Sequence, residues 1–154
     1  MEPVARNVGT EIPDRIIAEI RKDPPVTEAV PLISVDPEGY PHVALLSYFE
    51  LFLQDGSLCF FVHGGSRTGR FLKSGRRCTL LFVNRDYAVY VKGRARWLGD
   101  RESCSVFRLR VEAVLEDSPL PEEGDVFLQS GIRFGAGEEW LEGRGQLRRR
   151  MVWN

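Results

Sequence analysis

The chain has 154 residues, of which 43% are hydrophobic and 28% charged, and its formal net charge at pH 7 is −1. That length and balance are those of a single globular domain, and the near-zero charge argues against a basic surface for nucleic acid or anionic lipid. The charged, proline-containing start MEPVARNVGTEIPDR is not a secretory signal, and no apolar run is long enough to span a bilayer. We therefore expect one cytoplasmic domain over 1–154 that binds neither nucleic acid nor membrane.

The first predicted element is a helix near the N-terminus. Thr10 can cap it, Pro13 fits its first turn, and the pair Pro24-Pro25 ends it. Four isoleucines share one face of this helix: Ile12, Ile16, Ile17 and Ile20. We expect the helix to cover one end of a core.

Strand patterns dominate the chain after this helix. The six predicted strands are 29–35, 40–53, 58–63, 77–84, 87–98 and 105–115. Asp55-Gly56 is a strong hairpin signal, and Gly93 predicts a bulge or bend within its strand. Six closely spaced strands with almost no crossover helices predict a mainly β fold, an antiparallel barrel with short flanking helices.

The stretch HGGSRTGRFLKSG (63–75) interrupts the strands. Ser66 suits an N-cap and Gly75 suits a left-handed C-terminal position, so we predict a short helix over 67–74. Its glycines, hydroxyls and the cations Arg67 and Arg70 have the chemistry of a phosphate cradle. A solvated turn before a charged helix is the alternative on these residues alone.

Cysteine and histidine spacing predicts no metal site. Cys59, Cys78 and Cys104 are widely separated, form no CxxC pair and have no metal-type spacing to His42 or His63. Buried free thiols are the simpler interpretation. No nucleophile–base arrangement or carboxylate pair is legible, so we assign no catalytic residue.

The order of these elements resembles the pyridoxamine 5'-phosphate oxidase-like superfamily of FMN-binding split barrels. The resemblance covers roughly residues 10–116, with 117–154 as a divergent C-terminal extension, and rests on GYPHVALL and FFVHGGSRTGRFLKSGRRCTLLF in this order. It implies a six-stranded split barrel that forms a homodimer, with FMN at the subunit interface.

The resemblance also implies the cofactor-binding residues. The phosphate maps to Ser66, Arg67 and Thr68, and the ring edge takes backbone hydrogen bonds around Ala44, Leu45, Leu46 and Ser47. The third strand, Phe60 to His63, runs beneath the cofactor, which adds Phe61, Val62 and His63. Strand 87–98 is a candidate source of residues that close the partner's site.

Departures from the oxidase pattern shape the functional expectation. His42 and Ser47 stand where the oxidases carry an arginine and a lysine, and Thr68 replaces a second phosphate-binding cation. The C-terminus lacks the Arg-x-His of the oxidases, and its arginines at 148–150 fit a solvated tail or the mouth of a neighbouring site. We therefore expect a short, divergent member of the superfamily rather than a true pyridoxamine 5'-phosphate oxidase. The expected function is that of an FMN-dependent oxidoreductase acting on an unknown small molecule.

Several alternatives stay open on the sequence. They are a non-catalytic flavin or haem carrier or sensor, a deazaflavin-dependent reductase, and a cofactor-free dimeric barrel with structural or interaction work. His63 is either a strand-end histidine or a polar group beside the flavin. His42 is expected to be structural or exposed.

Overall fold

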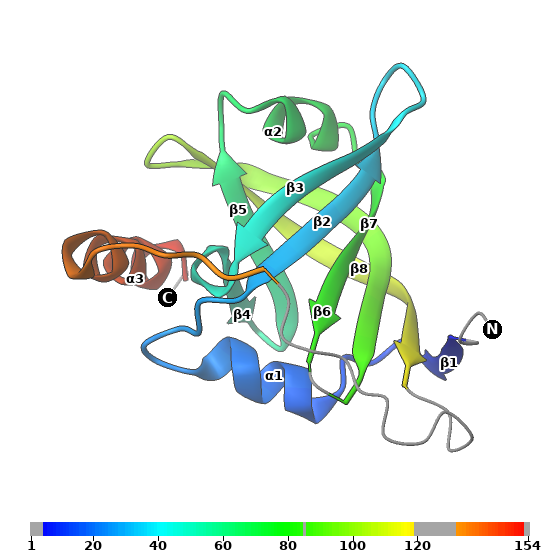
Figure 1. Ribbon diagram of the computed structural model, residues 1–154. Coiled ribbons are helices and arrows are strands. Elements are labelled where there is room, and N and C mark those ends of the chain that lie inside the picture. The colour runs from blue at the N-terminus through cyan, green and yellow to red at the C-terminus, as the bar shows by residue number, and fades with distance from the viewer. Residues whose placement is uncertain (1–4, 85, 119–131, 153–154) are drawn as a thin grey trace.

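The fold is a strongly curved antiparallel sheet with three helices around it. It is described by a computed structural model that covers residues 5–84, 86–118 and 132–152. In Figure 1, α1 (Asp14–Arg21) closes one end of the sheet, α2 (Arg67–Leu72) lies at the opposite end, and α3 (Glu138–Met151) flanks β4. No helix in these ranges is long and apolar enough to cross a membrane.

The sheet has eight strands where the sequence predicts six. They are β1 (Arg6–Gly9), β2 (Ala29–Val35), β3 (Pro41–Ser47), β4 (Leu51–Gln54), β5 (Ser57–His63), β6 (Arg77–Val83), β7 (Ala88–Arg101) and β8 (Cys104–Asp117). Their order is β3-β2-β6-β7-β8-β5-β4, with β1 paired to β8, and all pairs are antiparallel. The mainly β, barrel-like prediction is confirmed, while the strand count is corrected.

The extra strands have two sources. β1 is a short, exposed segment without apolar alternation, so no pattern predicts it. The single strand expected over 40–53 is divided by a 3-10 turn, η1 (Tyr48–Glu50). Ser47 caps this turn by accepting from the Phe49 N–H at 3.2 Å, and Glu50 accepts from the Ser47 N–H at 3.1 Å. SYFE is thus a capping box, a signal that outweighs the β propensity of the run.

Local turn signals place the other connections as predicted. Asp55 and Gly56 both have positive φ, 50° and 76°, as a tight hairpin between β4 and β5 requires. The β7–β8 pairing shifts register between Lys92 and Gly93, which confirms the bulge. A Cβ on Gly93 would lie 2.2 Å from the Arg110 carbonyl oxygen, so only glycine allows this close approach.

The N-terminal helix starts later than predicted. Its N-cap is Pro13 in an extended conformation, not Thr10, and α1 begins at Asp14. Proline's fixed φ and missing N–H suit this boundary, so the proline rather than the threonine sets it. Ile16 and Ile20 are buried in the end of the sheet, as the shared face predicts.

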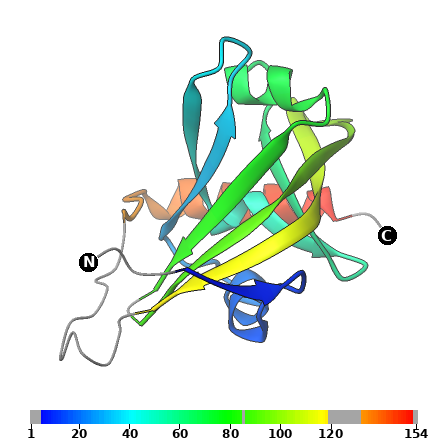
Figure 2. The same cartoon turned by 90° about the vertical axis from the view of Figure 1, so that its right-hand side faces the viewer.

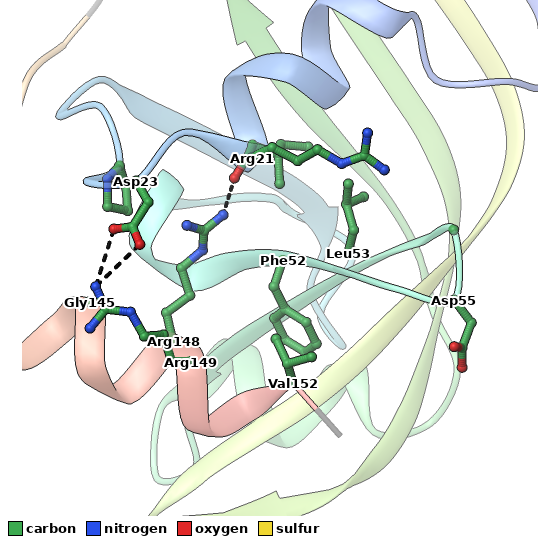
Figure 3. A pocket seen from close by; sticks show the side chains of 12 residues that line it. Arg21, Asp23, Phe52, Leu53, Asp55, Gly145, Arg148, Arg149 and Val152 are labelled. Atoms are coloured by element: carbon green, nitrogen blue, oxygen red, sulfur yellow. Dashed lines mark hydrogen bonds and ion pairs between the residues drawn. The ribbon is translucent and has the colours of Figure 1, made fainter. Parts of the chain in front are cut away.

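The expectation of a solvated arginine tail is wrong in part, because these residues belong to α3. Arg148 donates to the Leu51 carbonyl oxygen at 2.6 Å and to the carbonyls of Ile20 and Lys22. Figure 3 shows this side chain reaching from α3 to the end of α1, with Arg149 beside Asp23. Met151, the last residue of α3, is fully buried.

Two apolar clusters result from this packing. The main core fills the curved sheet and is closed by the isoleucines of α1. The second cluster lies between the outer face of β4, β5 and β8 and α3; its buried members are Phe52, Cys59, Phe61, Cys104, Val106 and Met151. All three cysteines are buried free thiols, and burial raises the pKa of Cys78 to about 12.

Candidate functional site

A cleft of about 230 Å³ lies where the curved sheet is split, between β3 and β5. It contains eight of the ten residues that the resemblance implies: Ala44, Leu45, Leu46, Phe61, Val62, His63, Ser66 and Thr68. Glu50, Cys104 and Arg144 complete the lining. The eight implied residues come from two stretches of the chain, 44–46 and 61–68, which meet at one site, and Arg67 and Ser47 do not line it.

Ser66 and Thr68 present their hydroxyls at the start of α2. The Ser66 Oγ accepts from the Gly69 N–H at 3.0 Å, which confirms the predicted N-cap. Gly75 follows the helix with a φ of 78°, as its C-terminal role predicts. Thr68 is buried, and its Oγ1 lies 2.8 Å from the His42 Nε2.

His42 therefore has a structural task that sequence reasoning did not specify. Its ring packs edge-on against Phe71 with centroids 5.2 Å apart, while its Nε2 bonds to Thr68. This contact joins β3 to α2 across 26 residues and fixes the position of the Thr68 hydroxyl beside the cleft.

Arg67 points away from the cleft, toward the β2–β3 turn. Its Nη2 lies 2.8 Å from the Glu38 Oε2 and 3.7 Å from the Asp36 Oδ2, and its side chain is 56% exposed. The Tyr40 N–H hydrogen bond, followed by the Glu38 N–H and Arg67, lowers the pKa of Asp36, so the carboxylate stays charged. The arginine expected to bind phosphate is thus already paired with two acids.

Gly64 also differs from its expected role. Its N–H donates to the Ser103 carbonyl oxygen at 2.9 Å, and an added Cβ would lie 3.1 Å from the same oxygen. The glycine thus lets the 63–66 loop approach the β7–β8 turn, rather than opening the backbone to a ligand.

Ser47 lies on β3 but is almost fully buried, and its hydroxyl bonds to Glu50 within the capping box of η1. His63 is exposed at the end of β5, and its Nδ1 accepts from the Gly65 N–H at 3.2 Å. With Nδ1 as the acceptor, the neutral ring carries its proton on Nε2.

The cleft also contains two ionisable groups, Glu50 and Arg144, that the sequence did not indicate. Burial raises the pKa of Glu50, and the charge of Arg144 acts in the opposite direction. Arg144 lies over the Trp140 ring at 5.5 Å, and this ring packs against Phe49 with centroids 5.9 Å apart. Arg144 reaches the cleft because α3 packs beside η1, a long-range contact without a local sequence signal.

The geometry defines what the cleft can bind. Leu46, Phe61 and Val62 offer buried apolar walls, while Ser66 and Thr68 offer hydroxyls at one end. Among the described strands β3 pairs only with β2, so its outward backbone groups can bond to a ligand. The cleft thus suits a flat, mostly apolar ligand with a polar end.

The β3 edge also exposes apolar side chains. Val43 is 56% exposed and Leu45 47% exposed, and Val35 and Tyr40 lie exposed at the neighbouring turn. Contiguous exposed apolar groups beside a cleft are typical of an interaction surface.

Comparison with known proteins identifies the family. The family model described as pyridoxamine 5'-phosphate oxidase matches residues 16–133. No curated protein matches the sequence significantly.

Solved structures of low sequence identity share the fold. A conserved hypothetical protein from Mycobacterium tuberculosis superposes with a TM-score of 0.57 at 14% identity, covering 86% of this chain and 98% of that one. A candidate 5-nitroimidazole antibiotic resistance protein from Bacteroides thetaiotaomicron gives 0.54 at 10% identity, covering 76% and 89%. HutZ, the haem storage protein from Vibrio cholerae, gives 0.53 at 10% identity, covering 70% and 95%. With the family match over most of the chain, the split sheet places this protein in the pyridoxamine 5'-phosphate oxidase-like superfamily.

Proposed function

We propose that this protein binds FMN in the cleft between β3 and β5 and acts as a flavin-dependent oxidoreductase on a small molecule. The observation that carries the proposal is the convergence of eight implied cofactor residues, from the two stretches 44–46 and 61–68, on one cleft. A bound flavin would supply hydride or electron transfer, while the protein binds and orients it.

The donor set of the cleft fits such a ligand. The apolar walls suit the flat ring system, and the free backbone edge of β3 suits the polar edge of that ring. The hydroxyls of Ser66 and Thr68 lie at the opposite end, where a phosphate would accept from them. Thr68 is held in place by His42, and its hydroxyl can donate to a phosphate in the tautomer whose Nε2–H donates to Thr68.

A phosphate would compete with Glu38 for the guanidinium of Arg67. A phosphate at the start of α2 would have to draw the Arg67 guanidinium from Glu38, with which it pairs at 2.8 Å. Arg144 is the one guanidinium among the described residues that already line the cleft. We therefore expect Arg144 to contribute to anion binding together with Arg67.

A second copy of the chain is part of the proposal. The cleft, about 230 Å³, is smaller than the roughly 300–1,000 Å³ of typical ligand pockets. The exposed apolar residues Val43 and Leu45 border it on β3. A homodimer that covers this strand would enlarge the cleft into an enclosed site and bury the apolar surface.

Haem is the second candidate, since HutZ shares the fold and is a haem storage protein. His63 is the exposed histidine at the mouth of the cleft. A histidine that binds a metal through one ring nitrogen almost always donates its other N–H to an acceptor. The Nδ1 of His63 instead accepts from the Gly65 N–H, so the ring is not arranged for ligation through Nε2. This geometry favours FMN.

Ligand titration of the purified protein tests the proposal. We expect FMN fluorescence to be quenched with saturation at one FMN per chain, and haemin to give no His63-dependent shift of its main absorption band.

Arg67→Ala should weaken the binding of FMN more than that of riboflavin, because only FMN carries the phosphate. Oxidation of reduced nicotinamide with an added acceptor would separate an enzyme from a carrier, and a deazaflavin as ligand would test that alternative. Absence of FMN binding, or a haemin spectrum that His63→Ala abolishes, would overturn the proposal.

A further inference from the structure

A second concave region lies away from the cleft, toward the β4–β5 turn and the segment before α1. It has a volume of about 640 Å³, within the roughly 300–1,000 Å³ of small-molecule sites. The outer faces of β7 and β8, the β4–β5 turn and the segment before α1 surround it, and it shares no lining residue with the cleft. Figure 2 looks onto β7 and β8, with β1 and α1 beside their lower ends.

Arginines gather on this face of the two long strands. Arg96 stands directly opposite Arg108, and Arg94 directly opposite Arg110. Like charges directly opposite each other on neighbouring strands are destabilising. Arg94 has Glu112 at 3.8 Å, whereas no ion pair joins Arg96, Arg108 or Arg110 to any residue in the described parts of the chain.

Arg108 is the most buried of these arginines. Its Nε is buried and has no hydrogen-bond partner among the described residues. It faces Cys59 across the β5–β8 pair, where burial raises the pKa of the thiol, and a hydrogen bond from Arg108 and its charge oppose that effect. The partly buried guanidinium therefore has a neutral thiol, a weak acceptor, as its side-chain partner, while its Nε–H has none. Such a donor is usually satisfied by a ligand, an ion or water.

The other residues that line this region indicate what else a ligand would contain besides an anionic group. Its apolar lining consists of Ile12, Ile17, Leu58, Leu109 and Val111. Glu11 is the single acidic residue of the lining, against three arginines. The formal net charge of −1 provides no broad basic surface for a nucleic acid, so the three arginines suit a small anionic ligand better.

We propose that this arginine pocket binds a small phosphate monoester with an apolar body. Guanidinium groups donate in a fork that matches phosphate oxygens, and three of them can neutralise a dianion. The apolar walls would contact the organic part. A bound phosphate would accept from the orphaned Arg108 Nε and relieve the repulsion between Arg96 and Arg108.

Phenyl phosphate is a suitable probe, with inorganic phosphate, benzoate and phenol as comparisons. We expect calorimetry to show binding of phenyl phosphate at least tenfold tighter than of inorganic phosphate or benzoate, and no binding of phenol. Amide chemical shifts should change at residues 10–12 and 108–111 and remain unchanged at 44–46 and 61–68. The last group distinguishes this pocket from the proposed FMN cleft.

Charge-removing variants complete the test. Arg110→Gln and Arg108→Gln should weaken phenyl phosphate about tenfold or more, because each removes a charge-assisted donor. Arg77→Gln is the matched control: this exposed arginine lies on β6 outside the pocket, so binding should change less than twofold. Arg96→Gln should leave the ligand-free protein at least as stable as the parent, since it removes an opposed like charge.

Three results would overturn the proposal. They are no phenyl phosphate binding at millimolar concentration, chemical-shift changes confined to the cleft, and loss of a dimer in the Arg108→Gln and Arg110→Gln variants without any loss of binding. The last result would assign the arginines to a contact between subunits.

Discussion

The two edge strands of the sheet, β3 and β4, differ in how far the rest of the chain covers them. The β4 edge is covered by the chain itself, because α1 and α3 pack against it and Arg148 bonds to the Leu51 carbonyl there. The β3 edge, among the described residues, pairs only with β2 and exposes Val43 and Leu45. An unprotected edge strand invites further pairing, so natural proteins cover edges that have no partner. The contrast agrees with the proposal that a ligand and a second subunit cover β3.

The largest expected effect is at the covered edge. Arg148→Ala removes the donor to the carbonyls of Ile20, Lys22 and Leu51, which hold the end of α1 and β4 against α3. We expect a loss of about 2–4 kcal/mol in the free energy of unfolding, because partly buried acceptors lose their donor. Urea denaturation followed by circular dichroism measures it.

Arg149→Ala is the matched control for this change. Arg149 is the next residue of α3, 62% exposed, and pairs with the exposed Asp23. Its removal should cost less than about 1 kcal/mol, as for other surface pairs. Equal losses for the two variants would show that Arg148 does not hold the covered edge.

A substitution on the open β3 edge should change the association of subunits rather than the stability of the fold. Val43→Glu places a charge in the exposed apolar patch of β3. We expect the dissociation constant of the proposed homodimer to rise at least tenfold. The free energy of unfolding of the monomer should change by less than about 0.5 kcal/mol, as for ordinary surface positions. Sedimentation velocity at several concentrations separates the two effects.

Val8→Glu serves as the control, since Val8 is also exposed but lies on β1 away from the cleft. It should leave association unchanged. A Val43→Glu protein with the same association state as the parent would contradict the role assigned to the β3 edge.

A smaller effect is expected where the β2–β3 turn meets α2. Glu38→Gln removes the acid that pairs with Arg67, so the guanidinium becomes available to a phosphate. FMN should bind about two- to tenfold tighter, while riboflavin affinity should stay constant. Flavin fluorescence titration measures both ligands. Glu102→Gln, which removes an exposed partner of Arg150 instead, should alter neither affinity.

Sequence patterns predicted the parts of the fold that depend on neighbouring residues. The Ser66 cap, the Asp55-Gly56 hairpin and the Gly93 bulge are set within a few residues of themselves, so their signals are local. The SYFE capping box was such a signal as well, but the apolar run around it concealed the break between β3 and β4.

The site was predicted less completely because its decisive contacts are long-range. Arg67 meets Glu38 across 29 residues, and His42 meets Thr68 across 26. Arg144 reaches the cleft only through the packing of α3, whose arginine-rich sequence resembles a solvated tail. Residue types therefore indicated the segments that form the cleft, while only the tertiary packing shows which cations face it.

The smallest effect is expected at Glu50, in the turn that joins the open β3 strand to the covered β4 strand. Burial raises the pKa of Glu50 above its ordinary value of 4.5, so the fold favours its protonated form. That stabilisation is complete below the ordinary pKa and is lost as the pH rises through the raised pKa.

Glu50→Gln keeps an acceptor for the Ser47 N–H but cannot ionise. It should therefore be more stable than the parent at pH 7, and the difference should shrink toward pH 4. Thermal unfolding across this range measures the trend. Glu50→Ala, which loses the cap, should be less stable than Glu50→Gln by about 1 kcal/mol at every pH, because neither variant ionises. A difference between Glu50→Gln and the parent that does not vary with pH would show that Glu50 is not the titrating group at this junction.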